Sequence, residues 1–129
     1  MSCGVLVDTD VLIWYLRGNE KAAKSLEGLD SFCISVVTYM ELVQGMRNAK
    51  ELRTLKQTLR EWEVKIVQIE DEISMQASMY VEEYFLAHSM QLADALIAAT
   101  ASRLGAELLT ANDKHYKCLK DIKIKKFRS

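Results

Sequence analysis

The stretch GVLVDTDVLI, residues 4–13, places carboxylates between two apolar runs. Residues 5–7 are continuously apolar, which is typical of a buried parallel strand rather than a half-exposed one. Asp8 and Asp10 follow, and residues 11–13 resume the apolar run. Because acids are rarely buried without a partner, the stretch predicts a strand that ends in a polar site.

Length and composition favour one globular domain. The 129 residues are 50% hydrophobic and 27% charged, and no Pro-, Gly- or Ser-rich linker or internal repeat divides them. We therefore predict one domain spanning residues 1–129. No apolar run approaches the roughly 20 residues of a membrane span, and the N-terminus lacks the pattern of a signal peptide. Scattered cysteines, odd in number, predict free thiols and a reducing cytoplasm: Cys3, Cys33 and Cys118.

The net charge of −1 conceals an asymmetry along the chain. Residues 1–113 hold 10 basic and 17 acidic residues, whereas residues 114–129, the basic tail, hold 7 basic residues and one acidic residue. A basic segment can bind phosphates, or it can serve only as a solvated terminus. Two histidines, His88 and His115, are too few to build a metal centre by themselves.

Short apolar runs alternate with helical patterns, which predicts an α/β fold with a small parallel sheet flanked by helices. We expect strands at residues 4–8, 32–34, 66–69, 107–110 and 122–124. We expect helices at residues 10–17, 20–28, 36–46, 49–62, 71–87 and 92–104. Ser35 is expected to cap the third of these helices. Sheets of this class carry their sites at the carboxyl ends of the strands.

Three further acids share the apolar or strand-end setting of Asp8, namely Glu41, Asp94 and Asp113. Asp94 has almost no polar neighbour, although it could instead cap its own helix. Carboxylates that converge repel one another, and a divalent cation removes that repulsion. Such an ion can activate water and stabilise the oxygens at a reacting phosphorus atom.

Four segments in this order resemble the motifs of PIN-domain ribonucleases of the VapC toxin type: VLVDTDVLI, ISVVTYMELVQG, ADALIAATA and LLTANDKHY. The resemblance covers nearly the whole chain and implies a PIN-like domain. It assigns Asp8, Glu41 and Asp94 to the metal site, which would take Mg²⁺ or Mn²⁺. Thr9 would be the hydroxyl that orients the first acid, and Thr110 the hydroxyl of the fourth motif.

The fourth motif departs from the family pattern. The last acid commonly lies two residues after Thr110, where this chain has Asn112, and Asp113 follows one residue later. Either Asn112 contacts a metal-bound water or Asp113 completes the catalytic acids. Asp10 could share the side of Asp8 on an extended strand, but we favour a role as the cap of the next helix.

The resemblance implies metal-dependent hydrolysis of RNA, for which tRNA and rRNA are candidate substrates. Candidate RNA contacts are Arg17, Arg47 and Lys114 in the basic tail. It also implies a homodimer and a small antitoxin that covers the acidic pocket. Two apolar segments are candidate grooves or simply core: Trp14, Tyr15 and Leu16, and the stripe Leu52, Leu55, Leu59 and Trp62.

Three alternatives explain less of the sequence. A haloacid-dehalogenase-type phosphatase would use Asp8 as its nucleophile, but Glu41 and Asp94 would then have no role. A phosphoacceptor receiver domain lacks its acid pair and lysine at the expected places. A PIN-like binding module that no longer cleaves would have lost the acids, and this chain retains Asp8, Glu41 and Asp94.

Overall fold

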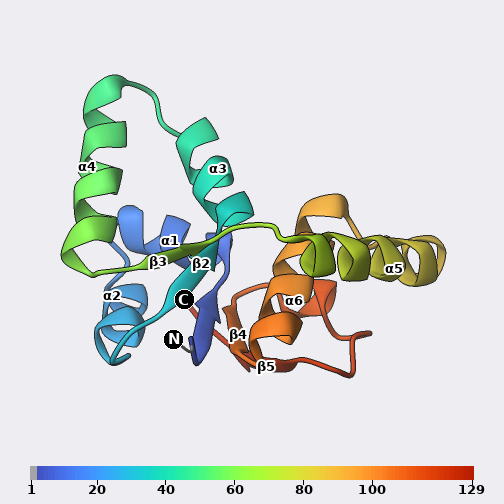
Figure 1. Ribbon diagram of the computed structural model, residues 1–129. Helices are drawn as coiled ribbons and strands as arrows, with labels where there is room; N and C mark the ends of the chain where they lie inside the picture. The colour runs from blue at the N-terminus through green and yellow to red at the C-terminus, as the bar shows by residue number, and fades with distance from the viewer. Residues whose placement is uncertain (1–2) are drawn as a thin grey trace.

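Five short parallel strands form the central sheet of the structure, a computed structural model that describes residues 3–129 (Figure 1). The strands are β1 (Val5–Val7), β2 (Cys33–Ser35), β3 (Lys65–Val67), β4 (Glu107–Thr110) and β5 (Lys123–Lys126). Their order is β3-β2-β1-β4-β5, and every neighbouring pair is parallel. The predicted α/β class is thereby confirmed. The sheet is small because each strand has only three or four residues.

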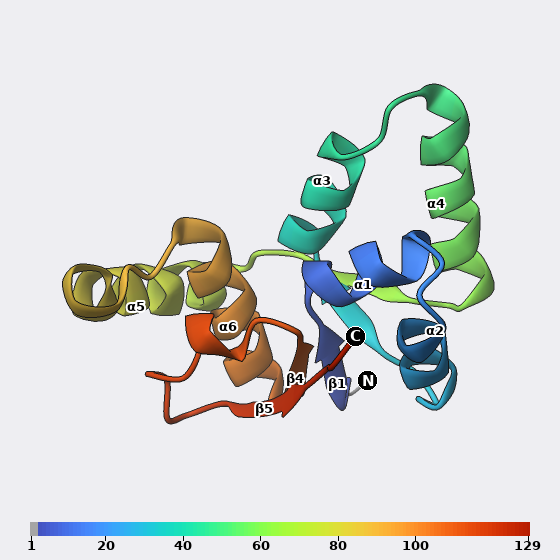
Figure 2. The ribbon, with the colours of Figure 1, turned by 180° about the vertical axis from the view of Figure 1, so that it is seen from behind.

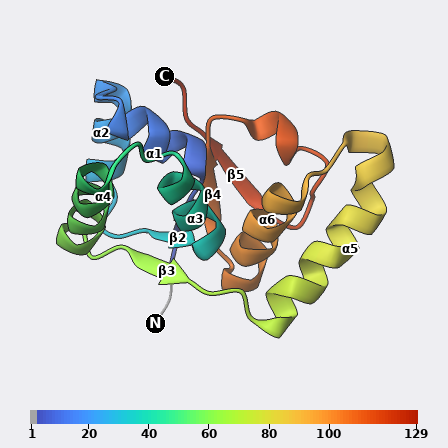
Figure 3. The same ribbon diagram turned by 90° about the horizontal axis from the view of Figure 1, so that it is seen from above.

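Helices connect the strands: α1 (Thr9–Leu16), α2 (Glu20–Glu27), α3 (Val36–Gln44), α4 (Ala49–Glu61), α5 (Asp71–His88), α6 (Leu92–Leu104) and the 3₁₀ helix η1 (Asp113–His115). Viewed from above, α1, α2 and α4 lie on one side of the sheet and α5 and α6 on the other (Figure 3). Seen from behind, α3 rises beyond the end of the sheet, next to the start of α1 (Figure 2). No helix within residues 3–129 is long and apolar enough to cross a membrane.

Strand alternation builds two cores, one on each face of the sheet. Leu6 and Leu108 point into the core beneath α5 and α6. Val7 and Leu109, the next residues on the same strands, point into the core beneath α1, α2 and α4. Since successive side chains of a strand face opposite ways, a strand with helices on both sides must be apolar at every position. This explains the continuous run at residues 5–7.

Caps at the helix starts test the sequence predictions. The Ser35 side chain accepts a hydrogen bond of 3.0 Å from the amide of Val37 and caps α3, as predicted. The capping role predicted for Asp10 is wrong, because Asp8 is the N-cap of α1 and Asp10 lies in the first helical turn. The alternative cap role of Asp94 is excluded as well, since Gln91 is the N-cap of α6. Both carboxylates are therefore free for tertiary contacts.

The prediction that all three cysteines are free is wrong. Cys3 and Cys33 form a disulfide, and only Cys118 is free among the described cysteines. The parallel pairing of β1 with β2 places Leu6 opposite Cys33, which brings the start of the chain beside Cys33. Spacing along the chain contains no trace of this contact, because the two cysteines are 30 residues apart.

Candidate active site

Asp8 stands at the carboxyl end of β1, at the centre of the sheet. It is 6% exposed, and its backbone amide continues the ladder to Leu109 with a bond of 2.9 Å. Its Oδ1 accepts a hydrogen bond from the amide of Thr9 at 2.8 Å, and its Oδ2 accepts one from the Thr110 hydroxyl at 2.8 Å. Thr110 ends the neighbouring strand β4, so two adjacent strand ends fix this carboxylate.

A tyrosine connects Asp8 to the second predicted acid. The Tyr116 hydroxyl donates to Asp8 Oδ2 at 2.9 Å and lies 3.4 Å from Oδ1 of Asp94 in the first turn of α6. The Nδ1 atom of His115 lies 3.3 Å from Asp94 Oδ2. Asp8 and Asp94 thus face each other across one hydroxyl group. Nothing in the sequence pattern of Tyr116 indicated this position.

Glu41 joins the group from α3. Its Oε1 accepts a hydrogen bond of 2.6 Å from the Thr9 hydroxyl, which also lies 3.0 Å from the Thr38 hydroxyl. Thr9 therefore orients Glu41 through its side chain and Asp8 through its backbone amide. The expected contact of its hydroxyl with the first acid is not formed, because the helical turn aims the side chain at α3.

Asp10 is a member of the site that the sequence reasoning assigned elsewhere. Its Oδ2 accepts from the amide of Ala111 at 3.0 Å and lies 3.3 Å from the Thr110 hydroxyl. Its Oδ1 is buried and has no hydrogen-bond partner in the described structure. The spacing of the two acids in DTD could have indicated that Asp10 belongs to the site, because a turn at the strand end lets both Asp8 and Asp10 reach Thr110.

Burial controls the ionisation of this group. Burial first, and next the charge of Asp10, raise the pKa of Asp8 from 3.8 to about 6, although hydrogen bonds from Thr110, Tyr116 and Thr9 oppose the rise. Burial also raises the pKa of Asp10. Burial and the charges of Asp8 and Asp94 raise the pKa of Tyr116, which keeps its hydroxyl protonated as a donor. The site concentrates negative charge where water is scarce.

The two candidates for the fourth position lie apart from this network. Asp113 pairs with the Nζ atoms of Lys126 at 3.4 Å and Lys117 at 3.9 Å. Although burial acts to raise its pKa, the two lysines hold it below its usual value. Asn112 is exposed, and its backbone amide donates to the Thr110 hydroxyl at 3.1 Å. Neither side chain takes part in the contacts that join Asp8 to Asp94.

The donor set suits a hard divalent ion held partly through water. Within residues 3–129, no three His, Cys, Asp or Glu side chains are grouped closely enough to hold an ion by themselves. Mg²⁺ is usually bound through one or two carboxylates, keeps several waters and takes substrate phosphates as further ligands. Asp8 and Asp94 meet that need, and the unpartnered Oδ1 of Asp10 is a further oxygen at the same edge.

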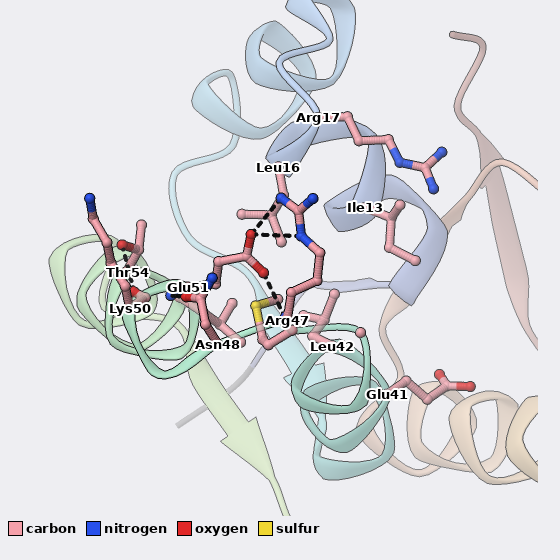
Figure 4. Close-up of a pocket in the computed structure, with 13 residues that line it drawn as sticks. Ile13, Leu16, Arg17, Glu41, Leu42, Arg47, Asn48, Lys50, Glu51 and Thr54 are labelled. Atoms are coloured by element: carbon pink, nitrogen blue, oxygen red, sulfur yellow. Dashed lines mark hydrogen bonds and ion pairs between the residues drawn. The ribbon is translucent and has the colours of Figure 1, made fainter.

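A groove of about 820 Å³ lies between α1, α3 and α4, and Glu41 of the site acids lines it (Figure 4). Apolar side chains line it together with Glu41, Arg17 and Arg47. Arg47 is 84% exposed and pairs with Glu51 at 2.7 Å. The two arginines proposed as RNA contacts therefore belong to the groove, whereas Lys114 is exposed in η1 and does not line the groove.

The segments predicted as grooves or core divide between these two roles. Leu55 and Leu59 are 2% and 7% exposed, and Trp62 packs against Tyr15 with ring centroids 4.9 Å apart and the ring planes tilted by 53°. These side chains belong to the core under α4, with Leu55 also reaching the groove. Leu16 is 39% exposed and lines the groove.

Comparison with known proteins gives a consistent result. The family model described as PIN domain matches residues 5–121. Ribonuclease VapC10 of Mycobacterium tuberculosis is 35% identical over 123 residues, which cover 92% of this chain and 90% of that protein. Ribonuclease VapC1 of Methanocaldococcus jannaschii is 33% identical over 122 residues, covering 94% of this chain and 85% of that protein.

Solved structures share the fold. A toxin-antitoxin complex from Klebsiella pneumoniae matches with a TM-score of 0.75 and 28% identity, covering 92% of this chain and 95% of the solved one. VapBC2 from Rickettsia felis, bound to a DNA fragment from its promoter, matches with a TM-score of 0.83 and 18% identity, covering 96% and 98%. At that lower identity the likeness concerns the fold alone.

Proposed function

Because the chain belongs to the PIN-domain family, we propose that residues 1–129 form a metal-dependent endoribonuclease of the VapC toxin type, held inactive by a cognate antitoxin. The carrying observation is the pair formed by Asp8 and Asp94, which a single hydroxyl joins at the carboxyl edge of the sheet. The family names of the relatives support the reaction class, and the site chemistry supports the metal.

We assign separate roles in RNA hydrolysis to the acids and to the two threonines. Asp8 and Asp94 would hold Mg²⁺ or Mn²⁺, with Glu41 assisting. When bound, such an ion lowers the pKa of a coordinated water and stabilises the oxygens that attack and leave phosphorus. Thr9 orients Glu41 toward the site, and Thr110 fixes Asp8. Because the pKa of Asp8 is about 6, the ligand is mostly ionised at neutral pH.

Basic groups next to the acids would bind the RNA backbone. Lys126 lies opposite Thr110 in the β4–β5 pair, at the same edge as Asp8. Asp113 holds both Lys126 and Lys117, so we assign it to placing these lysines rather than to the catalytic acids. Lys114 would add a further phosphate contact. Whether the substrate is tRNA or rRNA would follow from the shape of its exposed loops.

The groove between α1, α3 and α4 suits the antitoxin. Its apolar surface comes from Ile13, Leu16, Leu42, Met46 and Leu55, and Glu41 stands at its end near the acids (Figure 4). An amphipathic segment can lay an apolar face into such a groove, and a cationic side chain at its end would reach Glu41. The occupant would then block the route of RNA to the site.

A second copy of the chain would cover the outer face of α5. Met75, Met79 and Leu86 are 67%, 64% and 93% exposed on this helix, and exposed apolar patches commonly mark protein contacts. A homodimer would remove them from water. Light scattering of the wild type and of Met79→Glu tests this, with a dimer expected for the first and a monomer for the second.

An RNA substrate implies a cytoplasmic location, where disulfides are usually reduced. The disulfide that the structure shows between Cys3 and Cys33 would therefore be subject to reduction there.

The decisive experiment measures cleavage of total RNA by the purified protein with EDTA, Mg²⁺ or Mn²⁺. Asp8→Asn and Asp94→Asn each remove a charge at nearly constant shape, and Asp30→Asn, at an exposed position outside the site, is the matched control. We expect metal-dependent cleavage in the wild type and in Asp30→Asn, and a loss of at least about 100-fold in the other two variants. If no variant and no metal gives cleavage, the chain is a PIN-like binding module instead.

A further inference from the structure

Tyr116 contacts two of the proposed metal ligands, and the proposed reaction gives it no role. It follows η1 and is one of the largest fully buried side chains of the structure. Its hydroxyl donates to Asp8 Oδ2 at 2.9 Å and is 3.4 Å from Asp94 Oδ1. A buried phenol at the boundary of the α5–α6 core thus extends its one polar atom between two carboxylates.

The hydrogen bonds of Asp8 leave a defined set of free lone pairs. A carboxylate offers about four acceptor sites, two on each oxygen. Thr110 and Tyr116 fill both sites of Oδ2, whereas the Thr9 amide fills one site of Oδ1. The remaining site of Oδ1 is therefore the available one for a cation, provided that Tyr116 stays in place.

The contact with Asp94 gives the hydroxyl a second effect. Facing carboxylates repel, and the single O–H proton reduces that repulsion because it is shared between the 2.9 Å contact to Asp8 and the longer 3.4 Å contact to Asp94. The Thr110 hydroxyl contacts Asp8 and Asp10. Among the described residues, the hydroxyl that contacts both Asp8 and Asp94 is that of Tyr116. Complete burial of the ring prevents the hydroxyl from swinging away, because close-packed interiors leave side chains few alternative rotamers.

We propose that Tyr116 is a positioning residue whose hydroxyl fixes the orientation of Asp8 and its distance from Asp94, so that both carboxylates can bind the same divalent ion. The inference rests on the metal site of the proposed function and adds to it a residue outside the acids. Hydrogen bonds to ligating carboxylates typically change metal affinity about 10- to 100-fold when they are lost.

The test compares two phenols in matched settings. Tyr116→Phe removes the hydroxyl and keeps the ring that fills the core. Tyr80→Phe is the control, because the Tyr80 hydroxyl also donates to a carboxylate, Asp121 Oδ2 at 2.6 Å, in a cluster between α5 and α6 outside the site. Mn²⁺ is titrated into metal-free protein by calorimetry, and thermal melting in EDTA verifies that each variant is folded.

We expect Tyr116→Phe to weaken Mn²⁺ binding about tenfold or more, and Tyr80→Phe to change it less than about twofold. Equal affinity of Tyr116→Phe and wild type would overturn the inference and leave the proposed nuclease intact. No Mn²⁺ binding by the wild type would overturn both the inference and the metal dependence in the proposed function.

A second measurement covers the case in which Tyr116→Phe does not fold. Wild-type protein labelled with 3-fluorotyrosine is titrated with Mg²⁺ and followed by ¹⁹F NMR. The other four tyrosines are assigned through their Phe variants, which identifies the remaining signal as Tyr116. We expect this signal to shift with Mg²⁺ and the Tyr80 signal to stay. A Tyr116 signal that does not respond while Mg²⁺ binds would overturn the inference.

Discussion

Replacing Asp8 by Asn is expected to stabilise the metal-free protein at pH 7 while it removes nuclease activity. Asp8 is 6% exposed and its pKa is raised to about 6, chiefly by burial and next by the charge of Asp10. A raised pKa means that the folded state disfavours the ionised carboxylate. At pH 7 this carboxylate is charged, so it opposes folding unless a cation is bound.

The size of the effect follows from the pKa. The difference between 3.8 and about 6, at about 1.36 kcal/mol for each pH unit, corresponds to roughly 3 kcal/mol of destabilisation at pH 7. The Asn amide can keep its oxygen toward Thr110 and Tyr116, but its NH₂ group would face the Thr9 amide, which costs about 1 kcal/mol. A net gain of about 2 kcal/mol remains, or about 8 °C in Tm for a chain of this length.

The pH dependence has a definite sign. Between pH 3.8 and about 6 the folded state binds more protons at Asp8 than the unfolded state does, so stability falls as pH rises through this window. The raised pKa of Asp10 acts in the same direction. Without metal, the wild type is therefore expected to be about 1 kcal/mol more stable at pH 5 than at pH 7 through Asp8, and Asp8→Asn is expected to lack this increment.

The assay is thermal and urea unfolding in EDTA at pH 5, 6 and 7, with Asp30→Asn as the control for loss of one exposed charge. Mg²⁺ is then added, which stabilises a binding-competent protein by about 2.7 kcal/mol at 100 times Kd. Only the wild type and Asp30→Asn should respond. The reasoning is refuted if metal-free Asp8→Asn is less stable than the wild type at pH 7, or if wild-type stability does not rise toward pH 5.

Asp113→Asn is expected to change kcat less than about threefold but to weaken RNA binding in low salt, since it releases Lys126; filter binding and single-turnover cleavage separate the two. Thr9→Val removes the bond to Glu41, and a kcat about tenfold lower with an unchanged substrate Kd is expected; an unchanged kcat would mean that Glu41 needs no orientation. Cys3→Ser should lower the stability of oxidised protein by about 3.6 kcal/mol for a loop of 30 residues and change it little in reductant, as denaturant unfolding under both conditions can verify.

The sequence was sufficient for features that depend on neighbours along the chain. The continuous apolar run of residues 5–7 predicted a strand covered on both faces, and Ser35 was correctly identified as a helix cap. The helix at residues 92–104 and the strand at residues 107–110 have the expected bounds. Hydrophobic periodicity and capping act over a few residues, so one sequence contains them completely.

Boundaries set by strand pairing were less accurate. Residues 66–69 were expected as a strand, but β3 is Lys65–Val67 because its register follows β2, with Ser35 opposite Val67. The last strand moved in the same way, to Lys123–Lys126, where it pairs with all four residues of β4. A strand ends where its partner ends, and the partner lies far away in the sequence.

Long-range contacts within the site were decided only by the tertiary structure. Asp8 caps α1, and Asp10 instead accepts the amide of Ala111, which is 101 residues away. Asp113 contacts Lys126 because β5 pairs with β4. Tyr116 reaches Asp8 across 108 residues. The acids themselves could be named from the sequence, because buried charge stands out against apolar neighbours. The hydrogen-bond donors of these acids could not be named, because they depend on how the crossover connections bring separate strand ends to one edge of the sheet. Local sequence does not contain that information.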